Sequence, residues 1–178
     1  NSSQILHSQQ DMKKKILTKE IAEQFLEDEE VDLSEFTSIE DAAAESLSKH
    51  IAEYQGHSLD LDGLTSLSDA AAESLSKSKE FALRAQIYHS LSLNGLKRLS
   101  DATAKSFSKI NEGLDRYTTC GDDGTEPYSL SLNGLTELSD EAGKLLSKME
   151  TGCHSLYALL SLPDELRHKV NPYAWGNH

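Results

Sequence analysis

One motif recurs along the chain and constrains its fold more than any other feature. In residues 59–77 it reads Leu-x-Leu-Asp-Gly-Leu, a short spacer, and then Leu-Ser-Asp-Ala-Ala-Ala-Glu-Ser-Leu-Ser-Lys. Close copies occupy residues 91–109 and 130–148, and a looser copy occupies residues 31–49. Self-similarity at this interval is typical of repeat proteins, in which each unit buries its apolar face against its neighbours.

The first part of each unit predicts a short strand and a tight turn. Two leucines separated by one residue point to the same side of a strand. An Asx-Gly pair follows and predicts a turn, because glycine and asparagine adopt positive φ at low cost. These pairs are Asp62-Gly63, Asn94-Gly95 and Asn133-Gly134.

The second part of each unit predicts a helix. Leu67, Ala71 and Leu75 share one helical face, and Ser68 stands where an N-cap residue belongs. A strand, a helix and a parallel strand are joined by a right-handed crossover. The expected fold is therefore α/β, a short right-handed solenoid with parallel strands on one face and helices on the other.

The spacing of the copies suggests one repeat domain over residues 1–178. Matching leucines are separated by 28, 32 and 39 residues, and the variation lies between each helix and the next strand. The expected parts are a lead-in (1–16), an N-terminal half repeat (17–30), repeats at 31–58, 59–90, 91–129 and 130–159, and a C-terminal cap (160–178). The half repeat is expected to be a helix without a strand before it, and Pro163 is expected to open a short helix in the cap.

The pattern Leu-x-Leu-x-x-Leu-x-x-Leu-Ser-Asp-x-Ala-x-x-x-Leu at residues 59–75 resembles a leucine-rich repeat. It is most similar to the cysteine-containing subtype and to long bacterial arrays built on units of this kind. The resemblance covers roughly residues 17–162 and implies a protein-binding scaffold that works through its sheet face.

The units depart from that family at one position in particular. Leu64, Leu96 and Leu135 stand where the family has Cys or Asn. We therefore expect no ladder of side chains bonded to the turn backbone. The long intervals between units also predict uneven curvature.

Charge and composition limit the partners that the chain can take. Thirty acidic and seventeen basic residues give a net charge of −13, which disfavours nucleic acids and anionic membranes. No apolar run of about 18 residues is present, so no membrane insertion is expected. The expected partner is a protein or peptide. Whether Cys120 and Cys153 form a disulfide stays open, because the sequence does not give their separation.

Two surfaces are candidates for binding that partner. The first is the outward side of the strands, which is expected to carry small polar residues and could equally be a merely solvated face. Its candidate residues are Asp32, Asp60, Asp62, Ser92, Asn94, Ser131 and Asn133.

The second surface, which we favour, is the edge just ahead of the strands. It carries amphipathic aromatic residues and histidines of a kind that suits recognition. Its candidates are Tyr54, His57, His89, Tyr117 and Tyr128. His57, His89 and Tyr128 share one register and are expected to lie at the spacing of neighbouring strands.

No metal site, cofactor or catalytic centre is expected. Asp60-x-Asp62-Gly63 is similar to the start of a calcium loop, but Leu64 and Ala71 occupy positions that need oxygen ligands. Catalytic motifs such as Gly-x-Ser-x-Gly or His-Glu-x-x-His do not occur. The expected function is a non-enzymatic interaction module. The alternatives are a structural spacer from a longer array and a calcium-dependent module that uses the loop at 122–126.

Overall fold

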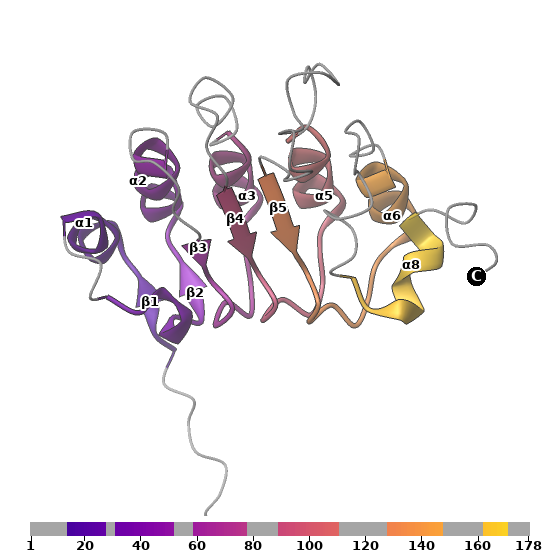
Figure 1. The fold of residues 1–178 in the computed structure, drawn as a ribbon, viewed down its shortest axis with the longest axis horizontal. Coiled ribbons are helices and arrows are strands. Elements are labelled where there is room, and N and C mark those ends of the chain that lie inside the picture. The colour runs from indigo at the N-terminus through magenta and orange to yellow at the C-terminus, as the bar shows by residue number, and fades with distance from the viewer. Residues whose placement is uncertain are drawn as a thin grey trace, which may run out of the picture.

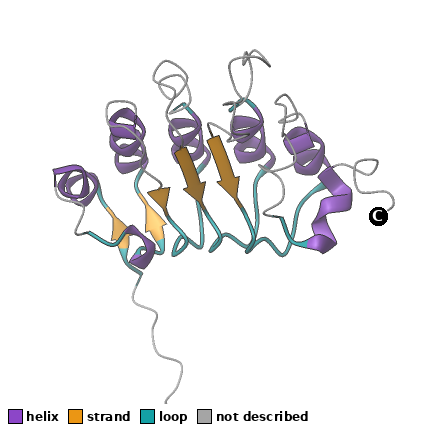
Figure 2. Cartoon of the chain, in the orientation of Figure 1, coloured by secondary structure: helices purple, strands orange, loops and turns teal. Residues whose placement is uncertain are grey.

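The computed structural model describes residues 14–27, 31–51, 59–77, 89–110, 128–147 and 162–170. Short strands and helices follow one another along these ranges (Figures 1 and 2). The strands are β1 (Ile16–Leu17), β2 (Ser38–Ile39), β3 (Leu59–Asp60), β4 (His89–Ser92) and β5 (Tyr128–Ser131). The helices are α1 (Lys19–Glu27), α2 (Asp41–Ile51), α3 (Asp69–Ser76), α5 (Asp101–Ser108), α6 (Asp140–Leu146) and α8 (Asp164–Val170), with a 3-10 helix η1 (Leu33–Glu35).

The helices and strands form two rows in a mixed α/β arrangement. Figure 1 shows α1, α2, α3, α5 and α6 side by side in one row, with the strands and turns in a second row beneath them. Strands β3, β4 and β5 form a parallel sheet in that order. No described strands close into a barrel.

The leucines of successive units lie side by side, as the motif predicts. Leu59 pairs with Leu91, and Leu91 pairs with Leu130. The ladder extends one residue beyond the assigned strands, because the Leu61 N–H donates to Ser92 O and the Leu93 N–H donates to Ser131 O, both at 2.9 Å.

The core lies between the two rows. The leucines that follow the turns belong to it, since Leu64, Leu96 and Leu135 are all buried. Alanines on the inner faces of the helices are buried as well, so the helices approach the strand row closely. The last leucine of each Leu-x-Leu-x-x-Leu motif is thus a core residue.

The predicted helices after Ser68, Ser100 and Ser139 are confirmed. In each case the serine hydroxyl accepts a hydrogen bond from the backbone N–H three residues later, at 2.9–3.0 Å. An aspartate begins each helix, where it interacts favourably with the helix dipole.

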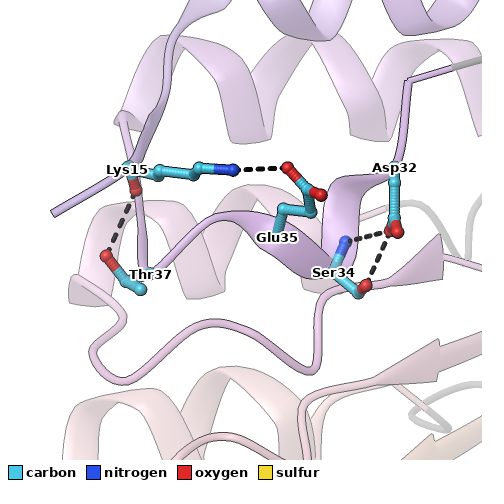
Figure 3. A network of polar contacts seen from close by, with 5 residues as sticks. All are labelled: Lys15, Asp32, Ser34, Glu35 and Thr37. Carbon is cyan, nitrogen blue, oxygen red and sulfur yellow. Dashed lines mark hydrogen bonds and ion pairs between the residues drawn. The ribbon is translucent and has the colours of Figure 1, made fainter. Parts of the chain in front are cut away.

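The strand expected around Leu33 is wrong. Residues Leu33–Glu35 form η1, and Asp32 is its N-cap instead of an outward strand residue. One oxygen of Asp32 accepts from the Ser34 N–H at 2.9 Å and from the Ser34 hydroxyl at 2.6 Å, which bends the chain (Figure 3). This local bonding competes with extended structure.

The N-terminal half repeat also differs from its prediction, because β1 precedes α1. Strand β1 pairs with β2 in parallel, Ile16 with Ser38 and Leu17 with Ile39. This pairing lies after the turns, immediately before the helices. A bridge between Arg98 and Glu137 occupies the same place in later units. A second, discontinuous line of strand pairing therefore runs beside the helix N-termini.

The turn glycines are required for a reason that the sequence did not suggest. Gly63, Gly95 and Gly134 form the predicted turns, but their φ angles lie outside the left-handed region that favours glycine. A Cβ on Gly95 would lie 2.1 Å from Asp62 O, and one on Gly134 would lie 1.5 Å from Asn94 O. Glycine is needed because the backbone of the preceding unit passes directly against the turn.

Helix α8 covers the far end of the helix row, beside α6 (Figure 1). It begins directly after Pro163, as expected, and buries Leu166 and Val170. Gly143 of α6 stands where the other helices carry alanine, and a Cβ there would lie 2.6 Å from Lys169 O. The absence of a side chain at Gly143 thus allows the backbone of α8 to pack closely against α6.

Candidate interaction surfaces

A ladder of polar side chains runs across the units at their turns. Asp62 Oδ1 accepts from the Asn94 N–H at 2.8 Å, and Asn94 Oδ1 accepts from the Asn133 N–H at 2.8 Å. Ser92 Oγ donates to Asp62 at 2.6 Å, and Ser131 Oγ donates to Asn94 at 2.7 Å. The expectation that no side-chain ladder bonds the turn backbone is therefore wrong. The Asx residue of each turn makes the ladder, two positions before the buried leucine that follows the turn.

The two ends of this ladder are distinct. At its start, Ser34 offers no Asx side chain to the next unit, and the Asp62 N–H donates instead to Asp60 Oδ1 at 3.0 Å. At its end, Pro163 follows Leu162 where Asn133 follows Leu132, and proline has no N–H to donate. Asp60 and Pro163 therefore mark where the ladder begins and where it stops.

The ladder holds Asp62 in its charged form. Partial burial by itself would raise the pKa of Asp62, but hydrogen bonds from Ser92 and from the backbone and side chain of Asn94 outweigh it. The pKa is lowered from its ordinary value of 3.8. The carboxylate is thus stabilised as an acceptor within the protein.

Most residues predicted for binding on the strand face belong to this ladder. Asp60, Asp62, Ser92, Asn94, Ser131 and Asn133 lie together across β3, β4, β5 and their turns, and each bonds to another member. A ligand that used these groups would have to replace bonds already made. The sequence pattern that indicates this network is the recurring Ser-x-Asn or Asp-x-Asp at the strand ends.

A second ladder, which the sequence reading missed, links the helix N-termini. The capping serine of each unit donates to the first aspartate of the preceding helix: Ser68 to Asp41, Ser100 to Asp69 at 2.5 Å, and Ser139 to Asp101. Lys169 of α8 completes the series by donating to Asp140 at 3.0 Å. The sequence pattern that could have indicated this ladder is the repeated Ser-Asp dipeptide. Its serine caps its own helix and also donates to the first aspartate of the preceding helix.

The aromatic edge is described only in part. His89 and Tyr128 are paired neighbours at the start of β4 and β5, as predicted. The other candidates, Tyr54, His57 and Tyr117, lie outside the described residues, as do Cys120, Cys153 and the loop at 122–126.

One exposed position on the helices changes from acidic to basic along the row. It holds Glu23, Glu45 and Glu73 in the first three helices and Lys105 and Lys144 in the next two. Ion pairs to Lys49 at 2.6 Å and Lys77 at 2.9 Å engage two of the glutamates. Hydrogen bonds from these lysines lower the pKa of Glu45 and of Glu73 from the ordinary 4.5.

Within the described ranges, no three His, Cys, Asp or Glu side chains gather in a way that could hold a metal ion. No described helix has both the length and the apolar character needed to cross a membrane. Comparison with family models, with curated proteins and with solved structures finds no match to this chain.

Proposed function

We propose that the chain is a short, right-handed, leucine-rich-repeat-like solenoid that acts as a non-enzymatic protein-interaction module. The observation that carries this proposal is the in-register stacking of units, because the strand, turn and helix N-terminus of one unit each bond to the next. Such stacking produces a long continuous surface on a rigid frame, which is how repeat proteins bind partners.

The partner is expected at the aromatic edge instead of the strand face. Most polar groups of the strand face are bonded to one another, whereas His89 and Tyr128 are register partners at the start of β4 and β5. Tyrosine is among the residues that contribute most to binding free energy in interfaces. A protein or peptide that contacts this edge fits the proposal best.

Affinity capture with the full chain tests the proposal. The partner would be identified by mass spectrometry, purified and titrated calorimetrically against wild type, a Tyr117→Ala/Tyr128→Ala variant and a Thr65→Ala/Ser66→Ala control at exposed positions. Loss of the two tyrosines should weaken binding at least tenfold, and the control should bind like wild type. Equal binding by all three proteins would contradict the aromatic edge as the site.

A second candidate is a structural spacer without a specific ligand. The two ladders favour it, because they link successive units and occupy most polar groups of the strand face. Capture of no saturable partner by the wild-type chain would favour the spacer. The third candidate, a calcium-dependent module, predicts a Tm that rises with calcium and falls with chelator. An unchanged Tm would exclude it.

A further inference from the structure

A groove of about 600 Å³ lies beside the last described unit, next to α8. One wall is the stretch from Thr136 to Ser139, and α8 contributes Leu166 and Lys169. Leu138 and Leu166 are largely buried and give the groove an apolar lining. The groove therefore lies along backbone that, in earlier units, pairs with a following unit.

The backbone bonds of the earlier units show what is missing at this edge. Lys15 O accepts from the Thr37 N–H at 2.9 Å, Thr37 O from the Thr65 N–H at 3.0 Å, and Lys97 O from the Thr136 N–H at 2.9 Å. Thr136 O is the next acceptor in this series. Among the described residues no group donates to it. The carbonyl of Thr65 is also without a described donor, but there the following unit already packs against the turn, since a Cβ on Gly95 would lie 2.5 Å from Leu64 O.

A lysine already occupies the second acceptor of the same edge. In the first unit Leu17 O accepts from the Glu40 N–H at 3.0 Å. At the equivalent place Leu138 O accepts from Lys169 Nζ at 2.8 Å, so a side chain substitutes for the backbone of a further unit. The edge is therefore satisfied at Leu138 and open at Thr136.

The lining of the groove also includes charged side chains. Arg98 and Glu137 form an exposed ion pair there at 2.9 Å. Exposed ion pairs contribute little free energy and rearrange readily, so this one does not prevent access to the apolar lining.

We propose that this groove binds an extended peptide segment. A backbone N–H of the peptide donates to Thr136 O, and an apolar side chain of the peptide packs against Leu138 and Leu166. The bound segment continues the strand pairing that already links Lys97 to Thr136, which is recognition by strand addition. The inference rests on the proposed role as an interaction module. It specifies one class of partner, an extended peptide, and one binding site, the groove beside α8.

The chain itself supplies the probe. A synthetic peptide with the sequence of residues 133–140 carries the threonine whose N–H bonds to Lys97 O in the protein. Titrated into the isotope-labelled full chain, it should shift the amide resonances of Thr136, Glu137, Leu138 and Leu166. The Thr65 resonance is an internal control and should not move, because the following unit already packs against that turn at Leu64 O.

The matched control is the same peptide N-methylated at its threonine, which removes the donated hydrogen. Its affinity should be at least roughly fivefold lower, the loss expected for one backbone hydrogen bond. Equal affinity of the two peptides, shifts outside the groove, or no shifts at millimolar peptide would overturn the proposal. If any of these occurred while the tyrosine substitutions still weakened the captured partner, only the groove would fall and the proposed function would stand.

Discussion

Residues 32–36 and residues 60–64 have similar sequences but different structures. Both read Asp-Leu, one polar residue, one further residue and an apolar residue. The later stretch follows β3 into a turn whose Asp62 bonds to the next unit. The earlier stretch is the 3-10 helix η1, and its Asp32 bonds to Ser34 in the same unit.

The difference shows that the turn is specified by the contact between units as well as by its own residues. Gly63 packs against Ser34 O and Phe36 O of the unit before it. Glu35 occupies the equivalent position in the earlier stretch, where its exposed carboxylate pairs with Lys15 (Figure 3). Glycine is thus required where a preceding turn approaches, and a charged side chain is accepted where none does.

The largest effect that would test this contrast is expected from Gly134→Ala. The added methyl would overlap Asn94 O, so the turn must move away from the preceding unit. We expect a loss of about 3 kcal/mol or more in the free energy of unfolding, measured by urea denaturation. Glu35→Ala is the matched control and should cost less than about 1 kcal/mol. Similar losses for both variants would remove the basis of the contrast.

The next effect concerns the ladder itself. Asn94→Ala removes the acceptor for the Asn133 N–H and the Ser131 hydroxyl and the donor to Asp62. The expected loss is about 2 kcal/mol in the free energy of unfolding, because several partners lose their bonds.

Asn133→Ala provides the comparison within the ladder. Its side chain makes one long contact to Ser131 Oγ, at 3.5 Å, and the following unit has Pro163 at the bonding position. Its loss should be less than about 1 kcal/mol. A larger loss for Asn133→Ala than for Asn94→Ala would mean that the bonds do not run from unit to unit.

A smaller effect is expected at the C-terminal end. Lys169→Met keeps much of the aliphatic stem but removes the bonds to Leu138 O and Asp140. We expect a loss of about 1 kcal/mol by thermal or urea unfolding. Lys144→Met, on the exposed face of α6, is the control and should change stability by less than about 0.5 kcal/mol. Indistinguishable variants would show that Lys169 does not fasten α8.

The smallest effect is the pH dependence contributed by Asp62. Its pKa in the folded chain is below the ordinary 3.8. Its contribution to stability is therefore present above about pH 4 and is lost as the pH falls through the folded-state pKa. Asp62→Asn removes this titration, so its unfolding free energy should fall less steeply than that of wild type below about pH 4. Parallel curves would contradict the stabilised carboxylate.

The sequence predicted those parts of the fold that depend on periodic burial. Leu61 and Leu93 lie in register, and the helices begin at Ser68, Ser100 and Ser139, because spacing and capping are local properties. The turns at the Asx-Gly pairs were also predicted, but the reason for their glycines was not, because the close approach of a neighbouring turn cannot be read from one unit. Strand β1 was missed because it depends on pairing with β2.

The candidate surfaces were predicted less well for a related reason. Asp60 and Asn94 are the right residue types for recognition, but Asp60 accepts a bond from the Asp62 N–H in its own unit and the Asn94 amide donates to Asp62 of the preceding unit. Only the distances between side chains in the folded protein show whether a polar group is available to a ligand or already hydrogen-bonded within the protein. The register of His89 with Tyr128 could be predicted, because it follows from the alignment of the leucines.

The measurement that tests the account most directly is a methyl–methyl NOE spectrum of the leucine-labelled chain. Because each unit stacks on the next, Leu61 should contact Leu93 and Leu93 should contact Leu132. Leu61 and Leu132 should show no cross-peak, since they lie two strand spacings apart, roughly 10 Å. A direct Leu61–Leu132 contact, or no contact from Leu93 to either, would contradict the stacking of units on which the fold and the proposed function depend.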